Sequence, residues 1–113
     1  DVYNPKTVRA TMGSIFHIPI FVDIDIEELI ALLVERETNV YATAVDSNKT
    51  IYDCDYTNKT AIVIGNEANG IRKEIKDIIH NYITIPMPGG SESLNASIAA
   101  GICMYEVVRQ RNT

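Results

Sequence analysis

The apolar run Ala61-Ile62-Val63-Ile64-Gly65 constrains the fold of this chain more than any other stretch. Apolar and polar residues do not alternate in it, so the pattern predicts a strand that is buried on both faces. Such a strand belongs in a parallel sheet covered by helices on both sides. Helical patterns and other short apolar runs alternate along the rest of the chain. We therefore expect an α/β fold, a mostly parallel sheet with helices on both faces.

Four helical patterns accompany the strands. Asn4-Pro5 is typical of a helix start and precedes apolar residues predicted to form one buried face: Val8, Met12, Ile15 and Phe16. An Asp25-x-x-Glu28 pattern begins a second helix that runs to Glu37, with Leu29, Leu32 and Leu33 on it. A third follows Gly70, with Arg72, Lys73 and Lys76 outward and a core face of Ile71, Ile75, Ile78 and Ile79. The fourth runs to Arg109.

Three further runs are predicted to be extended: Ile18–Val22, Val40–Val45 and Tyr82–Ile85. Pro19 makes the first of them an edge or irregular strand. The polar stretch from Asp46 to Thr60 is predicted to be a loop or short hairpin. Its tyrosines, Tyr52 and Tyr56, could stack on a base, but packing onto the sheet is the simpler expectation.

Length and composition bound the function. The 113 residues correspond to one domain, and no run approaches the ~18 apolar residues of a membrane span. Cys54 and Cys103 lack partners at metal-ligand spacing, which argues against zinc or any other metal site and favours a reduced, cytoplasmic setting. The net charge of −5 argues against this chain binding nucleic acid by itself. An RNA partner would need basic surface elsewhere.

Two polar loops follow successive strands, so both are expected at one edge of the sheet, where they would form a cleft. The first, Gly65-Asn-Glu-Ala-Asn-Gly70, is neither a P-loop nor a dinucleotide fingerprint, and Glu67 could simply cap a helix. The second runs from Pro86 to Asn95, and Ser91 or Ser93 could be its helix cap. We expect Asn95 in the first helical turn, where a buried amide must find partners.

The final helix is more apolar than a surface helix should be. A helical wheel places Asn95, Ala99, Ile102, Glu106 and Arg109 on one stripe. The opposite side holds Ser97, Ala100, Gly101 and Met104. Small residues allow another backbone to approach closely, so we expect this helix to be covered nearly all round, by its own sheet and by a dimer partner.

These residues resemble a known family. Gly65-Asn-Glu-Ala-Asn-Gly70, followed by Ile85-Pro-Met and then Glu92-Ser-Leu-Asn-Ala-Ser97, is similar to motifs two and three of SpoU-type (TrmH-like) RNA ribose 2′-O-methyltransferases, members of the SPOUT superfamily. Asn4–Phe16 and Tyr105–Arg111 also resemble segments of that family. The resemblance covers effectively the whole chain.

The resemblance implies a C-terminal trefoil (α/β) knot that binds S-adenosylmethionine in its loops and works as a homodimer packed through the last helix. By position it gives Gly65, Ile85 and Leu94 as cofactor contacts, with Thr43 near the same cleft. Glu67, Ser93 and Asn95 match polar positions that shape the active site. The implied reaction is methyl transfer to a ribose 2′-hydroxyl, with ribosomal RNA preferred over transfer RNA.

One part of the family pattern is not among these residues. The first motif, whose arginine is implicated in activating the ribose hydroxyl, is missing, as is the N-terminal RNA-binding domain of many relatives. We therefore expect residues 1–113 to be a knotted methyltransferase domain that lacks its N-terminal part, and we do not give Arg9 the catalytic role. Two other functions stay open: a nucleotide- or phosphate-binding regulatory module without chemistry, and a non-catalytic dimerisation domain.

Overall fold

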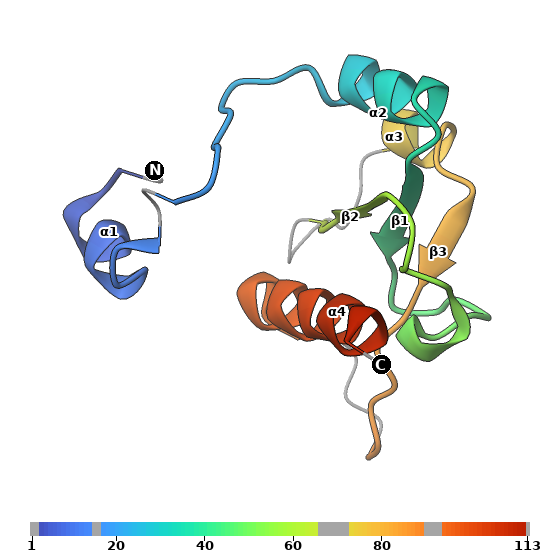
Figure 1. Ribbon diagram of the computed structural model, residues 1–113. Coiled ribbons are helices and arrows are strands. Elements are labelled where there is room, and N and C mark those ends of the chain that lie inside the picture. The colour runs from blue at the N-terminus through green and yellow to red at the C-terminus, as the bar shows by residue number, and fades with distance from the viewer. Residues whose placement is uncertain (1–2, 15–16, 66–72, 90–93, 113) are drawn as a thin grey trace.

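The described residues form a sheet of three strands that pair in parallel, as predicted (Figure 1). The computed structural model describes residues 3–14, 17–65, 73–89 and 94–112. The strands are β1 (Asn39–Thr43), β2 (Thr60–Val63) and β3 (Asn81–Ile83), in the order β2-β1-β3. Tyr41 in the central strand is opposite Ile62 on one side and Asn81 on the other. The crossovers between parallel neighbours are those of an α/β fold.

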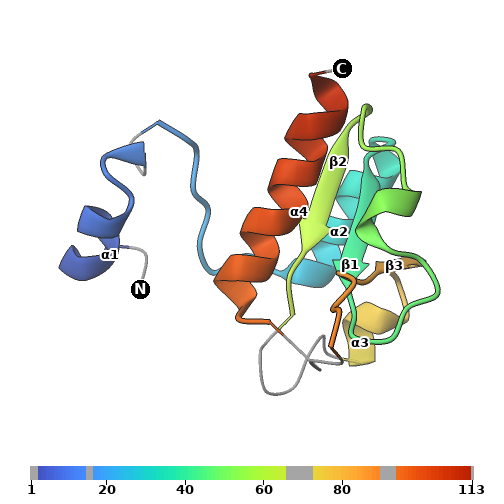
Figure 2. The same ribbon diagram turned by 90° about the horizontal axis from the view of Figure 1, so that it is seen from below.

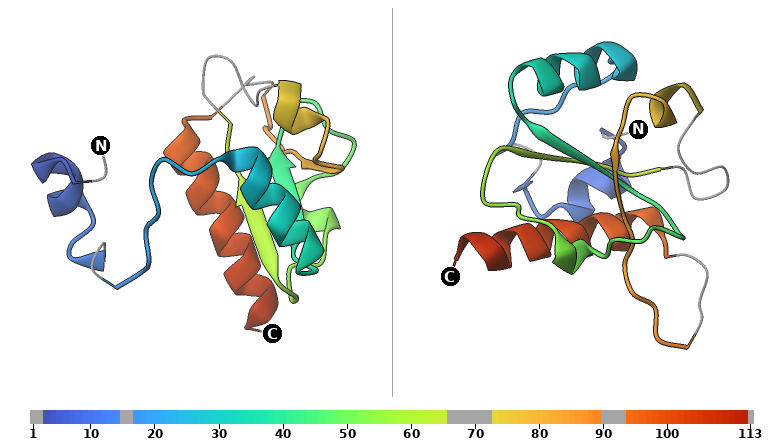
Figure 3. Two further views of the ribbon diagram at one scale, coloured as in Figure 1. Left: turned by 90° about the horizontal axis from the view of Figure 1, so that it is seen from above. Right: turned by 90° about the vertical axis from the view of Figure 1, so that its right-hand side faces the viewer.

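Helices cover both faces of this sheet, which also confirms the prediction. α2 (Ile26–Glu35) and α3 (Lys73–Lys76) lie on one face, and α4 (Ala96–Arg111) lies on the other (Figures 2 and 3). The trefoil knot stays a prediction, because residues 66–72 and 90–93 lie outside the described residues.

The core consists of two apolar clusters separated by the sheet. Alternate residues of β1 point to opposite faces, so the central strand contributes to both clusters. On the α2–α3 face the buried residues are Ile30, Val40, Ala42, Ile75 and Ile79. On the α4 face they are Tyr41, Ile51, Tyr56, Ile83 and Cys103.

The strand that is buried on both faces is β1. The apolar run 61–65, for which this burial was predicted, contains most of β2 instead. All four residues of β2 are only half-buried, whereas Val40, Tyr41 and Ala42 of β1 are buried. The reason is position: β2 has a described neighbour on one side only. The apolar pattern therefore identified the sheet type correctly but not the central strand.

The predicted N-terminal elements are largely wrong. Asn4 caps a helix as expected, its Oδ1 accepting from the Lys6 N–H at 2.9 Å, but α1 (Pro5–Ala10) is short and holds no buried residue. Met12 has a φ of +52° and is 93% exposed. Ile18–Val22 has no partner strand among the described residues, and α1 stands apart from the sheet (Figure 1). The apolar side chains of α1 thus have no sheet to pack on; Ile15 and Phe16 lie outside the described residues.

The middle helices agree better with the sequence. The Asp25 carboxylate accepts from the Glu28 N–H at 3.2 Å and caps α2, as predicted. The three predicted leucines lie on α2, and the residues of this helix that pack in the core are Ile26, Ile30 and Leu33, with Leu32 exposed. In α3 and after it, the core positions Ile75, Ile78 and Ile79 are confirmed, whereas Ile71 and Arg72 lie outside the described residues.

The stretch 46–60 is a loop with one short 3-10 helix, η2 (Ile51–Asp53). Thr50 caps η2 and forms an isolated parallel bridge with Thr84. The two tyrosines differ: Tyr56 is buried on the sheet, as expected, whereas Tyr52 is 62% exposed. The Tyr56 hydroxyl donates to the Ile51 carbonyl at 2.7 Å, and its ring meets Tyr41 edge-on.

Candidate active site at the carboxyl edge of the sheet

The carboxyl ends of all three strands lie at one edge of the sheet, because the strands are parallel. α4 runs in the opposite direction. Its last turn reaches the chain just before β2: Gln110 Nε2 donates to the Cys54 carbonyl at 2.9 Å, and Arg111 Nε donates to the Tyr56 carbonyl at 2.9 Å. The first turn of α4 is therefore at the carboxyl edge, where Figure 2 also shows it.

Five of the predicted site residues lie at this edge. Thr43 ends β1, Gly65 follows β2, Ile85 follows β3, and Leu94 and Asn95 lead into α4. The first four are half-buried, so each contacts the protein on one side and remains accessible on the other. Glu67 and Ser93 lie outside the described residues.

Backbone hydrogen bonds hold the β1 and β3 ends of this edge in register. The Ala44 N–H donates to the Ile83 carbonyl at 2.9 Å, and the Thr84 N–H donates to the Lys49 carbonyl at 2.9 Å. The Ile51 N–H in turn donates to the Thr84 carbonyl at 3.0 Å. Ile85 then packs against the α4-side cluster. The segment after β1 thus braces the chain where it leaves β3.

The structure corrects the prediction that Asn95 lies in the first helical turn with a buried amide. Asn95 is the N-cap of α4, not a residue of the first turn, and it is exposed. Its Oδ1 accepts from the N–H groups of Ser97 at 2.8 Å and Ile98 at 3.3 Å. Asn is among the preferred N-cap residues because it satisfies helix donors that have no partner within the helix. The polar residue on an apolar helix is therefore explained first by capping, a role that the sequence had suggested for Ser91 or Ser93.

A buried acid on α4 was missed. Glu106 is 5% exposed, and its carboxylate accepts from Arg109 Nε at 2.8 Å, Arg109 Nη2 at 2.7 Å and Gln110 Nε2 at 3.0 Å. The hydrogen bonds from Arg109 lower the pKa of Glu106, aided by Gln110 and opposed by burial. The spacing of an acid with basic and amide partners three and four residues later was the available signal.

One side of α4 packs on the sheet, as expected, and its outer face is exposed in this single chain, so the expected cover by a dimer partner stays a prediction. Apolar side chains are exposed along the outer face: Ile98 by 54%, Met104 by 58%, Tyr105 by 72% and Val108 by 45%. On the small-residue side, Ser97, Gly101 and Met104 are exposed and Ala100 is half-buried.

An open groove of about 510 Å³ lies between α4 and η2. It is lined by Ile51, Tyr52, Ile98, Gly101, Ile102, Tyr105 and Glu106. This lining comes from η2 and α4 and includes none of the predicted cofactor residues, so the groove is not the predicted cofactor cleft.

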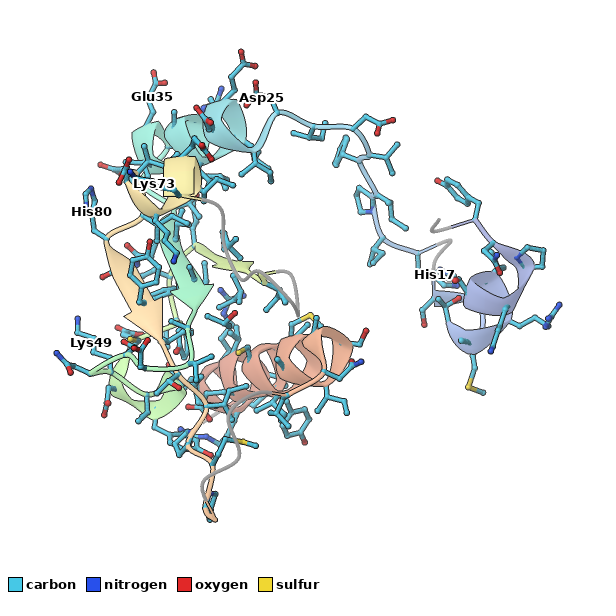
Figure 4. The ribbon with its side chains drawn as sticks, turned by 180° about the vertical axis from the view of Figure 1, so that it is seen from behind. His17, Asp25, Glu35, Lys49, Lys73 and His80 are labelled. Atoms are coloured by element: carbon cyan, nitrogen blue, oxygen red, sulfur yellow. The ribbon has the colours of Figure 1, made fainter. Side chains whose placement is uncertain are left out.

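The described residues contain no group of three metal-ligating side chains. His17 follows α1 whereas His80 follows α3, well separated in Figure 4. Cys103 is buried and Cys54 half-buried, neither in a disulfide; burial raises the pKa of the Cys103 thiol. None of the described helices combines the length and apolar character that a membrane span requires.

Comparison with known proteins gives consistent matches. Residues 1–105 match the SpoU rRNA Methylase family. Over 108 residues the chain is 33% identical to the 23S rRNA (guanosine-2'-O-)-methyltransferase RlmB of Pectobacterium atrosepticum, covering 96% of this chain and 44% of that protein. The chain thus spans less than half the length of such relatives.

Two solved structures are similar. The SpoU methyltransferase AviRb from Streptomyces viridochromogenes, in complex with the cofactor AdoMet, has a TM-score of 0.84 and 34% identity, covering 98% of this chain and 46% of that one. The A. aeolicus TrmH/SpoU tRNA modifying enzyme has a TM-score of 0.70 and 38% identity over 80% of this chain and 46% of that one.

Proposed function

Because the chain belongs to the SpoU rRNA methylase family, we propose that it transfers the methyl group of S-adenosylmethionine to a ribose 2′-hydroxyl of RNA. The family match over residues 1–105 carries this proposal. The carboxyl edge of the sheet supports it, because it gathers residues from three strand ends and one helix start where open α/β folds bind ligands.

The residues at this edge fit the cofactor. Ile85 and Leu94 are apolar and half-buried, so they can frame an adenosine without leaving a polar group unpaired. Gly65, also half-buried, lacks a side chain that would hinder approach to its backbone. Thr43 adds a hydroxyl beside them. We assign these four residues to cofactor binding, and Glu67 to organising the first loop.

The cofactor supplies an electrophilic methyl group on a sulfonium centre. The chain has to align the acceptor hydroxyl with that methyl and keep the cofactor oriented. We assign the alignment to Asn95, whose Oδ1 is engaged in capping, so its Nδ2 hydrogens would do the positioning. Ser93 is placed beside it by sequence. Removal of the hydroxyl proton falls, by the resemblance, to an arginine that is not among these residues.

Ribosomal RNA is the preferred substrate, in line with the RlmB relatives. Transfer RNA is the competing substrate, because a similar structure is a tRNA modifying enzyme. A methyl-transfer assay on the full-length protein, with labelled S-adenosylmethionine and matched ribosomal and transfer RNA pools, separates them. We expect label in ribosomal RNA and, on nuclease digestion, in 2′-O-methylated nucleosides.

Calorimetry separates the enzyme from a regulatory module. We expect S-adenosylmethionine to bind and ATP not to bind. ATP binding without S-adenosylmethionine binding would contradict the proposal. Cofactor binding without methyl transfer to any RNA would identify a domain that has kept the fold and lost its chemistry.

We also propose a homodimer that packs through α4, in the cytoplasm. The bare apolar face of α4 supports it, since exposed contiguous apolar surface is typical of an interface. Ile102→Asp, on the lining of the groove, is expected to shift the mass measured by light scattering from dimer to monomer. Val34→Asp on α2 is the matched control, because Val34 is 57% exposed on the opposite face of the sheet. An unchanged mass in Ile102→Asp would argue against this interface.

A further inference from the structure

The N-terminal segment differs in charge from the rest of the chain. Between Val2 and Val22 the sequence contains Lys6 and Arg9 and neither Asp nor Glu, whereas all but one of its 15 acidic residues lie from Asp23 onward. The net charge of −5 therefore conceals a basic segment that is joined to an acidic body. We call residues 3–14 and 17–22 the basic arm.

The basic arm presents its charges to solvent. Lys6 and Arg9 are both exposed on α1, and residues three apart lie on the same side of a helix. Among the described residues neither of them forms an ion pair; the pair that occurs there is Glu106–Arg109. α1 stands away from the sheet in Figures 1 and 2 and in the left view of Figure 3.

Aromatic rings flank the two basic residues. Tyr3 is 61% exposed and Phe21 is 78% exposed. Exposed rings and cationic side chains on one segment are the combination that single-stranded RNA recognition uses: the cations pair with phosphates, and the rings stack on bases. The acidic body carries Asp23, Asp25, Glu27 and Glu28 directly after the arm. Repulsion from these carboxylates would direct a polyanion toward the arm.

We propose that the basic arm is an RNA-contacting element in which Lys6 and Arg9 bind phosphates and Tyr3 and Phe21 receive unstacked bases. This inference rests on the proposed function, which makes RNA the substrate. The net charge had suggested that an RNA partner would need basic surface outside this chain. The proposal finds part of that basic surface within the chain.

The test is a charge reversal in the full-length protein, Lys6→Glu with Arg9→Glu. Its matched control is Lys73→Glu with Lys76→Glu, which makes the same change in net charge at two exposed residues that are also three apart on a helix. RNA affinity is measured by fluorescence anisotropy with a ribosomal RNA fragment over roughly 50 to 200 mM salt. Cofactor affinity is measured by calorimetry, and the fold by circular dichroism.

We expect the arm variant to bind RNA about tenfold more weakly, with the slope of log affinity against log salt reduced by about 0.7 for each lost phosphate contact. The α3 variant should lose less than about threefold, and cofactor affinity should not change in either. Phe21→Ala should weaken binding to the single-stranded fragment without altering the salt slope, because stacking releases no counterions.

Equal losses in the arm and α3 variants, or no loss in either, would overturn the proposal. A loss of dimer mass without a loss of RNA affinity would show that the arm docks on the acidic surface of a second copy instead. Failure of the proposed function is distinguishable, because the wild-type protein itself would then not methylate RNA.

Discussion

Asn95 has an observed role as a helix cap and a proposed role in positioning the acceptor hydroxyl, and substitution can separate the two. Its Oδ1 caps α4 through two hydrogen bonds, and its amide group is proposed to position the acceptor hydroxyl. Asn95→Ala removes both and should lower the free energy of unfolding by about 1 kcal/mol. For a chain of this length that corresponds to a fall in melting temperature of roughly 4 °C. Methyl transfer should also fall, by at least about tenfold, because the hydroxyl is no longer held in line.

Asn95→Asp and Asn95→Ser keep the cap and lose the amide. Both should unfold like the wild type in urea, with Asp slightly more stable because a carboxylate is favourable at a helix N-terminus. If the Asn95 amide positions the acceptor hydroxyl, kcat should fall in both variants, while calorimetry should give an unchanged affinity for S-adenosylmethionine. Wild-type kcat in these two variants would show that Asn95 is a cap and nothing more. Unchanged stability of Asn95→Ala would refute the capping argument itself.

Three further predictions concern stability, each measured by urea unfolding. Glu106→Gln should destabilise the protein at neutral pH by weakening the bonds from Arg109. The wild type should lose the Glu106 contribution as pH falls from the ordinary glutamate pKa, roughly 4.3, through the lowered pKa of the folded state, and this part of the acid dependence should vanish in the variant. Ile30→Ala should cost about 3 kcal/mol because it empties a core site, whereas Val34→Ala, on the same helix and 57% exposed, should cost under about 0.5 kcal/mol. Tyr56→Phe should cost about 1 kcal/mol, because the buried Ile51 carbonyl loses its donor; a cost near zero would mean that water replaces it.

The sequence predicted the α/β class and the helices on both faces because those follow from local apolar periodicity. It did not predict which strand is central, since β1 and β2 are both short and apolar and their order is set by pairing, not by composition. The buried face of α2 was not predicted for a related reason. Leu29, Ile30, Leu32 and Leu33 are all apolar, so the pattern allows more than one buried face, and the contact with β1 selects Ile30.

The candidate site was predicted in its position but not in its details. That loops after parallel strands share an edge is a rule of topology, so the loops that begin at Gly65 and after Ile85 could be placed together from the sequence, whereas Thr43 was placed beside them by the family resemblance. The cap depends on where α4 begins, and a boundary among Ser91, Ser93 and Asn95 cannot be fixed by propensity, because all three are good N-caps. The basic arm was missed because α1 was expected to pack on the sheet, and net charge averages over the whole chain.

The composition of α4 follows from the different demands on its parts. The helix starts at the candidate site, where Asn95 is polar because it caps the helix. Its last turns anchor the chain before β2: Glu106 orders Gln110, Gln110 binds the Cys54 carbonyl and the Tyr56 N–H, and Arg111 binds the Tyr56 carbonyl. Between these ends Cys103 is buried in the core, while the outer face is apolar and bare. A helix with these four features does not have a single apolar stripe, which accounts for its weak amphipathicity. Substitutions at its two ends should therefore act separately, with Asn95 variants changing kcat and Glu106 variants changing stability.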